Sequence, residues 1–92
     1  MALGFYFAPK GMTGDAYDDV IKQLEAAGQG APRGRQYHVA FDGGEGGLHV
    51  FDVWDSKEAF DQFGQTLMPI LADAGVDVGE PQVVEVHNIV EG

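Results

Sequence analysis

Residues 48–63 read LHVFDVWDSKEAFDQF and hold the clearest structural pattern in the chain. The first seven are rich in β-branched and aromatic side chains, which fit a pleated, buried surface, so they predict a strand ending at Trp54. Asp55 or Ser56 then supplies an oxygen that can cap a helix, and Asp55 with Glu58 resembles a capping box. This stretch therefore predicts a buried strand that leads directly into a helix.

Three further strands are predicted from the rest of the sequence. Residues 4–8 form a short aromatic strand, and residues 81–89 form the last strand. Residues 35–41 pair with residues 48–54 as a hairpin, and the glycine-rich segment 42–47 is its loop.

Two helices alternate with these strands. Thr13 is expected to cap the first helix and Gly28 to end it. The second is expected to break near Met68, with Pro69 starting a short further segment that ends at Gly75, because a proline inside a helix removes a hydrogen bond. The order β-α-β-β-α-β predicts an α+β, ferredoxin-like domain, in which a four-stranded antiparallel sheet carries both helices on one face.

The sequence pattern predicts that the second face of this sheet is also covered. Neighbouring positions at 39–41, 50–51 and 83–84 are apolar, whereas a face in contact with water would show polar alternation. The 92 residues predict one domain, 1–92, which has no cysteine to stabilise it and buries only about 60–65% of its unfolded surface. We therefore expect a homodimer through the sheet face, which is a dimeric α/β barrel.

The net charge of −10, from 15 acidic and 5 basic residues, argues against two classes of partner. Nucleic-acid binding needs clustered cations, and an anionic membrane surface repels an acidic protein. No segment approaches the roughly 20 apolar residues of a membrane span, and the first residues lack the pattern of a signal peptide. The sequence therefore predicts a soluble, cytoplasmic protein with no nucleic-acid partner and no membrane partner.

The hairpin loop suggests that Phe41 pairs with Leu48. In this register His38, His49 and Phe51 lie on one face of the sheet, and a slip of one residue would undo the assignment. The opposite face would then carry Tyr37, Val39, Phe41, Leu48, Val50, Asp52 and Trp54. Since an isolated buried acid is costly, we expect Asp52 to have a charged partner or an edge position.

Three histidines and one carboxylate are expected to point into the interior between the two sheets of the dimer, namely His38, His49, His87 and Glu85. Such a set could bind a metal ion, or it could act as acid and base on a substrate. Each residue could also be a half-buried strand residue that a neighbour satisfies. No His-x-His or His-x-x-x-His spacing supports a metal, so no metal ligands are assigned.

The chain resembles the dimeric α/β-barrel superfamily, which includes the antibiotic-biosynthesis-monooxygenase-like domains. The resemblance rests on FYF at 5–7, YHVA at 37–40, DVWDS at 52–56 and LMP at 67–69. It implies a small-molecule-binding homodimer, with the activity of a cofactor-independent monooxygenase or an isomerase/cyclase on a small apolar or aromatic compound. The competing hypothesis is a non-catalytic ligand-binding or stress-associated module.

Under the catalytic hypothesis, a histidine moves a proton and aromatic side chains hold the substrate. The candidate catalytic residues are His38, His49 and His87, and the candidate ligand-binding residues are Tyr6, Tyr37, Phe51, Trp54 and Glu85. His38 is expected to face a cavity that solvent can reach. Haem degradation is not expected, because this chain has Phe63 and Asp73 where the haem-degrading members carry a tryptophan and a histidine.

Overall fold

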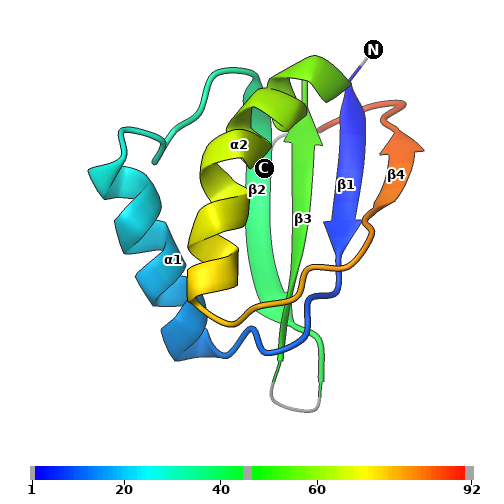
Figure 1. Ribbon diagram of the computed structural model, residues 1–92. Coiled ribbons are helices and arrows are strands. Elements are labelled where there is room, and N and C mark those ends of the chain that lie inside the picture. Colours follow the sequence, from blue (N-terminus) through cyan, green and yellow to red (C-terminus); the bar gives the residue numbers. More distant parts are fainter. Residues whose placement is uncertain (1, 45–46, 91–92) are drawn as a thin grey trace.

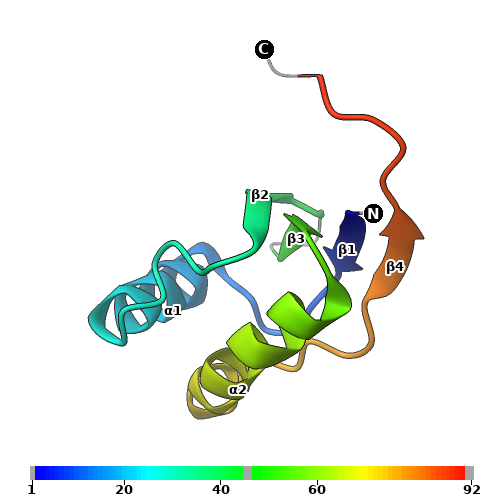
Figure 2. The same cartoon turned by 90° about the horizontal axis from the view of Figure 1, so that it is seen from above.

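The computed structural model describes residues 2–44 and 47–90, and its elements follow the order β-α-β-β-α-β. The strands form one antiparallel sheet in the order β2-β3-β1-β4, and both helices cover the same face of it (Figures 1 and 2). The elements are β1 Leu3–Phe7, α1 Gly14–Ala26, β2 Arg35–Asp42, β3 Leu48–Trp54, α2 Lys57–Asp73 and β4 Gln82–Glu85. The predicted α+β, ferredoxin-like fold is confirmed.

Both helices begin at side-chain caps. The Thr13 hydroxyl accepts a hydrogen bond from the backbone N–H of Ala16 at 3.1 Å, as predicted. The Ser56 hydroxyl accepts one from the N–H of Ala59 at 3.2 Å, which makes Ser56 rather than Asp55 the cap of α2. This cap fixes the point where β3 turns into α2, directly behind Trp54.

The break expected at Pro69 does not occur, because α2 runs without interruption from Lys57 to Asp73. Pro69 cannot donate a hydrogen bond to the carbonyl of Gln65, four residues earlier. Both residues are exposed, so water can satisfy that carbonyl. The helix therefore continues past Pro69 with one internal hydrogen bond fewer.

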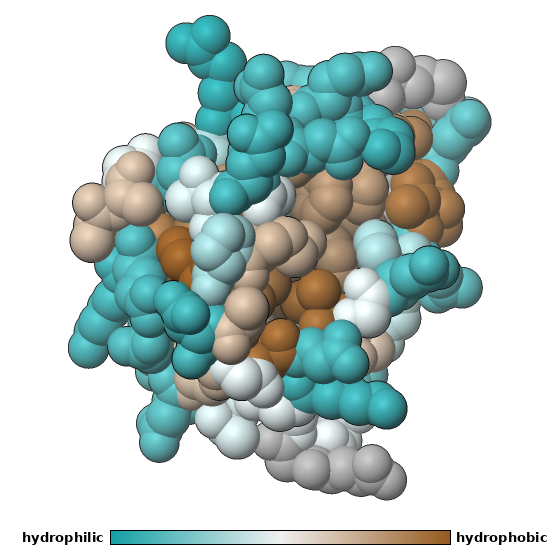
Figure 3. Space-filling model, in the orientation of Figure 1, coloured by the Kyte–Doolittle hydropathy of each residue, from teal (hydrophilic) through white to brown (hydrophobic). Residues whose placement is uncertain are grey.

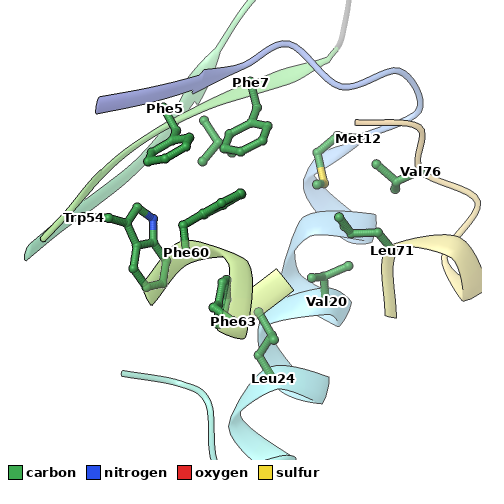
Figure 4. Packing of buried hydrophobic residues seen from close by; sticks show 11 residues of the cluster. Phe5, Phe7, Met12, Val20, Leu24, Trp54, Phe60, Phe63, Leu71 and Val76 are labelled. Atoms are coloured by element: carbon green, nitrogen blue, oxygen red, sulfur yellow. The ribbon is translucent and has the colours of Figure 1, made fainter. Parts of the chain in front are cut away.

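An aromatic core fills the layer between the sheet and the helices (Figure 4). The rings of Phe5 and Phe60 stack with their centroids 4.4 Å apart, and Trp54, which is completely buried, meets Phe60 edge-on at 5.7 Å. Pairs of this kind contribute about 0.5–1.5 kcal/mol each beyond the area that they bury. The buried cluster comprises Phe5, Phe7, Met12, Val20, Leu24, Val50, Trp54, Phe60, Phe63, Leu71 and Val76.

The hairpin register differs by one residue from the expected one. Asp42, not Phe41, pairs with Leu48, so His38 lies opposite Asp52. The Asp42 side chain also accepts a hydrogen bond from the N–H of Gly44 at 2.8 Å, which holds the start of the loop. The shift moves His38 from the outer face to the helix-covered face of the sheet, and the predicted face of His38 was therefore wrong.

A β-bulge interrupts β2 near its start. Arg35 pairs with Trp54 and Tyr37 pairs with Val53, so two steps along β2 match a single step along β3. Side chains alternate between the two faces of a regular strand, and the additional residue Gln36 reverses that alternation. Arg35 therefore lies on the helix-covered face with Trp54, whereas Tyr37 lies on the outer face.

The last strand is shorter than the predicted 81–89. It pairs with β1, and its final residue Glu85 lies opposite Leu3, the first residue of β1. One further bond, from the N–H of Val86 to the carbonyl of Ala2 at 3.0 Å, follows. Beyond it β1 offers no strand to pair with, and residues 86–90 leave the sheet on the side opposite the helices (Figure 2).

Candidate functional site

A group of hydrogen-bonded polar side chains connects α1 with the helix-covered face of the sheet. The hydroxyl of Tyr17 on α1 lies 2.7 Å from Nε2 of His38 on β2. Nδ1 of His38 lies 2.5 Å from Oδ1 of Asp52 on β3. The indole Nε1–H of Trp54 donates to the other oxygen of Asp52 at 3.2 Å. We call Tyr17, His38 and Asp52 the inner triad.

When His38 is neutral, the donors and acceptors of the inner triad have one consistent order. The Asp52 carboxylate accepts hydrogen bonds and cannot donate them, so the proton of a neutral His38 ring must be on Nδ1. Nε2 then carries the lone pair and accepts the phenolic O–H of Tyr17. The inner triad is therefore a directed chain in which Tyr17 donates to His38 and His38 donates to Asp52.

Burial explains why Asp52 keeps two partners. The residue is only 4% exposed, and an unpaired carboxylate in such a place is costly. His38 and Trp54 each donate to one of its oxygens, and β3 is a central strand. These two hydrogen bonds take the place of the charged partner or the edge position that the sequence led us to expect. The His38 side chain itself keeps 21% exposure, so the middle member of the inner triad stays accessible.

The Tyr17 phenol is held in its neutral form. Burial raises the pKa of Tyr17 above its ordinary value, the positive charge of Arg35 lowers it in part, and the negative charge of Asp52 raises it again. At neutral pH the hydroxyl therefore retains its proton and can donate a hydrogen bond to His38.

A cavity of about 60 Å³ lies between the helices and the sheet, and all three residues of the inner triad line it. Arg35 is the one other charged residue of the lining, and the rest is apolar apart from backbone. An apolar cavity of roughly 150 Å³ is needed to hold benzene, so a ligand of that size requires this cavity to widen. Apolar side chains reach the surface in the middle of the helix-bearing side, surrounded by hydrophilic ones (Figure 3). The lining is Phe7, Pro9, Met12, Tyr17, Val20, Ile21, Leu24, Arg35, His38, Val50, Asp52, Phe63, Leu67, Leu71 and Val78.

A second polar pair lies on the opposite, outer face of the sheet. The Tyr6 hydroxyl is 2.6 Å from Nδ1 of His49, and the Phe41 ring lies 6.2 Å from that of Tyr6. A hollow on this face is lined by Tyr6, Phe41, Phe51, Gln82 and Val84. The sheet thus separates Tyr6 and His49 from the inner triad.

The residues expected to share one interior are therefore spread over several places. His38 lines the inner cavity, whereas His49 and Phe51 lie on the outer face. Glu85 is exposed at the end of β4, and His87 is exposed beyond it. The expected convergence of three histidines and Glu85 is wrong.

The aromatic candidates divide in the same way. Tyr6 lines the outer hollow, and Tyr37 is 52% exposed on that face. Trp54 is completely buried in the core, where its indole N–H holds Asp52. Trp54 is therefore connected to the cavity only through its hydrogen bond to Asp52.

Sequence reasoning missed Tyr17 and Arg35 as site residues. Tyr17, Val20, Ile21 and Leu24 follow the helical spacing of one apolar stripe along α1, and Tyr17 is the member with a polar tip. That tip and the acid inside the apolar strand were the available signals, because both need buried hydrogen-bond partners. Nothing in the sequence indicated the bulge that places Arg35 beside the cavity.

Within 2–44 and 47–90, no three or more His, Asp or Glu side chains are grouped so that they could hold a metal ion. In the same part of the chain, no helix has the length and apolar character needed to cross a bilayer.

Comparison with known proteins finds similarity in fold alone. No protein-family model matches the chain, and no curated protein matches its sequence. A Nitrosomonas europaea protein of unknown function, NE2512, is similar at 20% identity and a TM-score of 0.61, covering 99% of this chain and 92% of that one.

Two other solved structures are similar over nearly their whole length. SnoaB, a cofactor-independent oxygenase from Streptomyces nogalater, has 16% identity and a TM-score of 0.60 over 99% of this chain and 96% of its own. Rv0793 from Mycobacterium tuberculosis has 21% identity and a TM-score of 0.51 over 98% and 95%. At these identities the likeness shows the fold alone, which is the ferredoxin-like β-α-β-β-α-β fold described above.

Proposed function

We propose that this protein binds a small, mostly apolar molecule in the inner cavity and removes a proton from it, as a cofactor-independent monooxygenase or an isomerase/cyclase. The observation that carries the proposal is the directed hydrogen-bond chain from Tyr17 through His38 to Asp52 on the cavity wall. The similarity in fold to a cofactor-independent oxygenase is consistent with it.

The inner triad has the parts that proton removal requires. Tyr17 takes a proton from the substrate as its own proton moves to Nε2 of His38, so a free phenolate never has to form. The imidazolium that results is stabilised by the carboxylate of Asp52, 2.5 Å away. The two donors to Asp52, His38 and Trp54, hold that carboxylate in place, and the charge separation occurs in a cavity with mostly apolar walls.

The fate of the substrate anion distinguishes the two activities. In an isomerase or cyclase the proton returns from His38 through Tyr17 to a different atom, and no co-reactant is needed. In a monooxygenase the anion gives its electrons to dioxygen, so that one oxygen atom enters the product as a carbonyl and the other leaves as water. Both begin with the same proton transfer, and that step is the one to test.

We also propose that the outer face of the sheet packs against a second copy of the chain. Phe41 is 41% exposed and Val84 is 49% exposed on this face, beside the half-buried rings of Tyr6 and Phe51. Isolated apolar residues on a surface are ordinary, but a contiguous group of this kind marks an interaction site. A second copy presents the same apolar surface, and a chain of 92 residues gains stability from such an interface.

Proton removal can be tested before the physiological substrate is known. Purified protein is incubated in D₂O with a panel of small 1,3-diketones and phenols, and mass spectrometry follows the gain of deuterium at their acidic carbon atoms. We expect exchange above the buffer rate for at least one compound. The variant His38→Gln keeps polar groups for hydrogen bonding but cannot hold the proton, so it should lose this exchange.

The variant His49→Gln tests the other histidine candidate with the same chemical change. Exchange that survives His49→Gln and disappears in His38→Gln would support the inner triad as the site. Loss in His49→Gln alone would place the chemistry on the outer face. Saturable binding of panel compounds without any exchange would instead support a non-catalytic binding module.

A further inference from the structure

We propose that the ligand of the inner cavity is a monocarboxylate, an apolar molecule whose single carboxylate binds to Arg35. The proposal rests on the inner cavity being the functional site and adds the chemical class of its ligand. It assigns Arg35 as the residue that selects for negative charge.

The bulge in β2 gives Arg35 its position at the cavity. On a regular strand Arg35 would share the outer face with Tyr37, two residues later. The additional residue Gln36 turns Arg35 to the side of its partner Trp54, where it lines the cavity. Bulges often redirect a side chain next to a functional site, and this one brings the single cation of the lining to the cavity.

The backbone before Arg35 is fixed by close packing. Gly34 has φ of +92°, and a Cβ atom built on it would lie 2.6 Å from the Cβ of Ala59 on α2. The carbonyl of Gly34 accepts a hydrogen bond from the N–H of Asp55 at 2.8 Å. Only glycine fits this approach without strain, so the position of Arg35 is set by the contact between the loop and α2.

The charge of Arg35 has no acidic partner among the described residues. Within 2–44 and 47–90, no carboxylate lies within 4.0 Å of its guanidinium, although the chain has 15 acidic residues. Its recorded hydrogen bond goes to the carbonyl of Gly30 at 3.2 Å, and its Cζ lies 5.9 Å from the centre of the Phe63 ring. A guanidinium has five N–H donors, so most of them remain for a ligand.

A carboxylate fits these donors best. The planar guanidinium binds the two oxygens of a carboxylate side by side, with charge-assisted hydrogen bonds. The second charge of the lining is Asp52, whose carboxylate would repel a ligand of higher negative charge such as a phosphate dianion. Arg35 and Asp52 thus favour one negative charge at one end, with the remaining apolar part of the molecule among the core side chains and near the inner triad.

Matched pairs of acids and amides test this inference. Benzoate, phenylacetate and 3-phenylpropionate are titrated against the wild-type protein by calorimetry, each beside the amide of the same size. We expect at least one acid to bind about tenfold more tightly than its amide. The preference should disappear in Arg35→Gln and persist in Arg33→Gln, which removes the same charge from an exposed residue outside the cavity lining.

A measurement on the wild-type protein covers the case in which Arg35→Gln does not fold. The Nε–H resonance of Arg35 in a nitrogen-proton NMR spectrum should shift with the acid and not with the amide. Equal affinity for acid and amide, a preference that survives Arg35→Gln, or no binding of any acid at about 10 mM would overturn the proposal.

The deuterium exchange assay separates this inference from the proposed function. Exchange on neutral compounds, together with equal affinity for each acid and its amide, would leave proton removal in place and refute the carboxylate site. Arg35-dependent binding of acids without exchange in any compound would support the carboxylate site and refute proton removal.

Discussion

Asp52 is the residue whose replacement most directly tests the inner triad. In Asp52→Asn the side-chain oxygen can still accept from Trp54, but the new NH₂ group faces Nδ1 of His38 and can only donate. His38 must then move its proton to Nε2, which leaves no lone pair there for the Tyr17 hydroxyl. Because both partners of the residue are retained, we expect a loss of less than about 1 kcal/mol in the free energy of unfolding.

The variant Asp52→Ala has a larger effect because it removes the acceptor altogether. The indole N–H of Trp54, a completely buried residue, then has no partner, which costs about 1–3 kcal/mol. Loss of the charge-assisted hydrogen bond to His38 adds to this cost. Part of the cost is offset because the variant no longer buries a carboxylate. We expect a net loss of about 2–3 kcal/mol, or roughly 10–20 °C in Tm for a chain of this size.

Two measurements decide the outcome, both made at one protein concentration. Chemical denaturation gives the two free energies, and the ¹⁵N shifts of the imidazole ring show which nitrogen of His38 is protonated. Wild-type protein should carry the proton on Nδ1, and Asp52→Asn should carry it on Nε2. A proton on Nε2 in the wild type, or an Asp52→Ala variant as stable as the wild type, would refute the directed hydrogen-bond chain.

Two further predictions concern the outer face and the pH dependence of stability. Phe51→Glu should sediment as a monomer of 9.9 kDa, because the dimer would bury an unpaired charge. The control Gln65→Glu adds the same charge on an exposed part of α2 and should remain a dimer. A Phe51→Glu variant that remains a dimer would contradict the proposed interface. Burial raises the pKa of Tyr17 above 10.0 in the folded protein. The contribution of Tyr17 to the free energy of unfolding is therefore complete below pH 10 and is lost as the pH rises through the folded-state pKa. Urea unfolding between about pH 8 and 11 should therefore show a shallower fall for Tyr17→Phe than for the wild type, and equal slopes would exclude this role.

The order of the elements was predictable because local signals agree with one another. Thr13 and Gly28 bound α1, and the strand ending at Trp54 passes directly into α2. Each signal depends on a few neighbouring residues, so it does not require knowledge of the rest of the fold. The topology followed from the alternation of strand and helix patterns.

The register of the hairpin was not predictable on the same basis. Register is fixed strongly only where one face of a strand is apolar and the other polar, and here Val39 with Ala40 and Val50 with Phe51 are apolar on both. The pairing of His38 with Asp52 reveals the true register, but it also places two polar residues on the face expected to be the more apolar. The composition of the candidate site therefore became visible only in three dimensions.

Pro69 has a consequence for the motion of the cavity wall. The carbonyl of Gln65 has no helical donor, so α2 can open locally at this point at a lower free-energy cost than in its first turns. Leu67 and Leu71 lie on either side of the proline, and both line the cavity. A local opening of α2 at Pro69 would therefore widen the cavity from the side of Leu67 and Leu71.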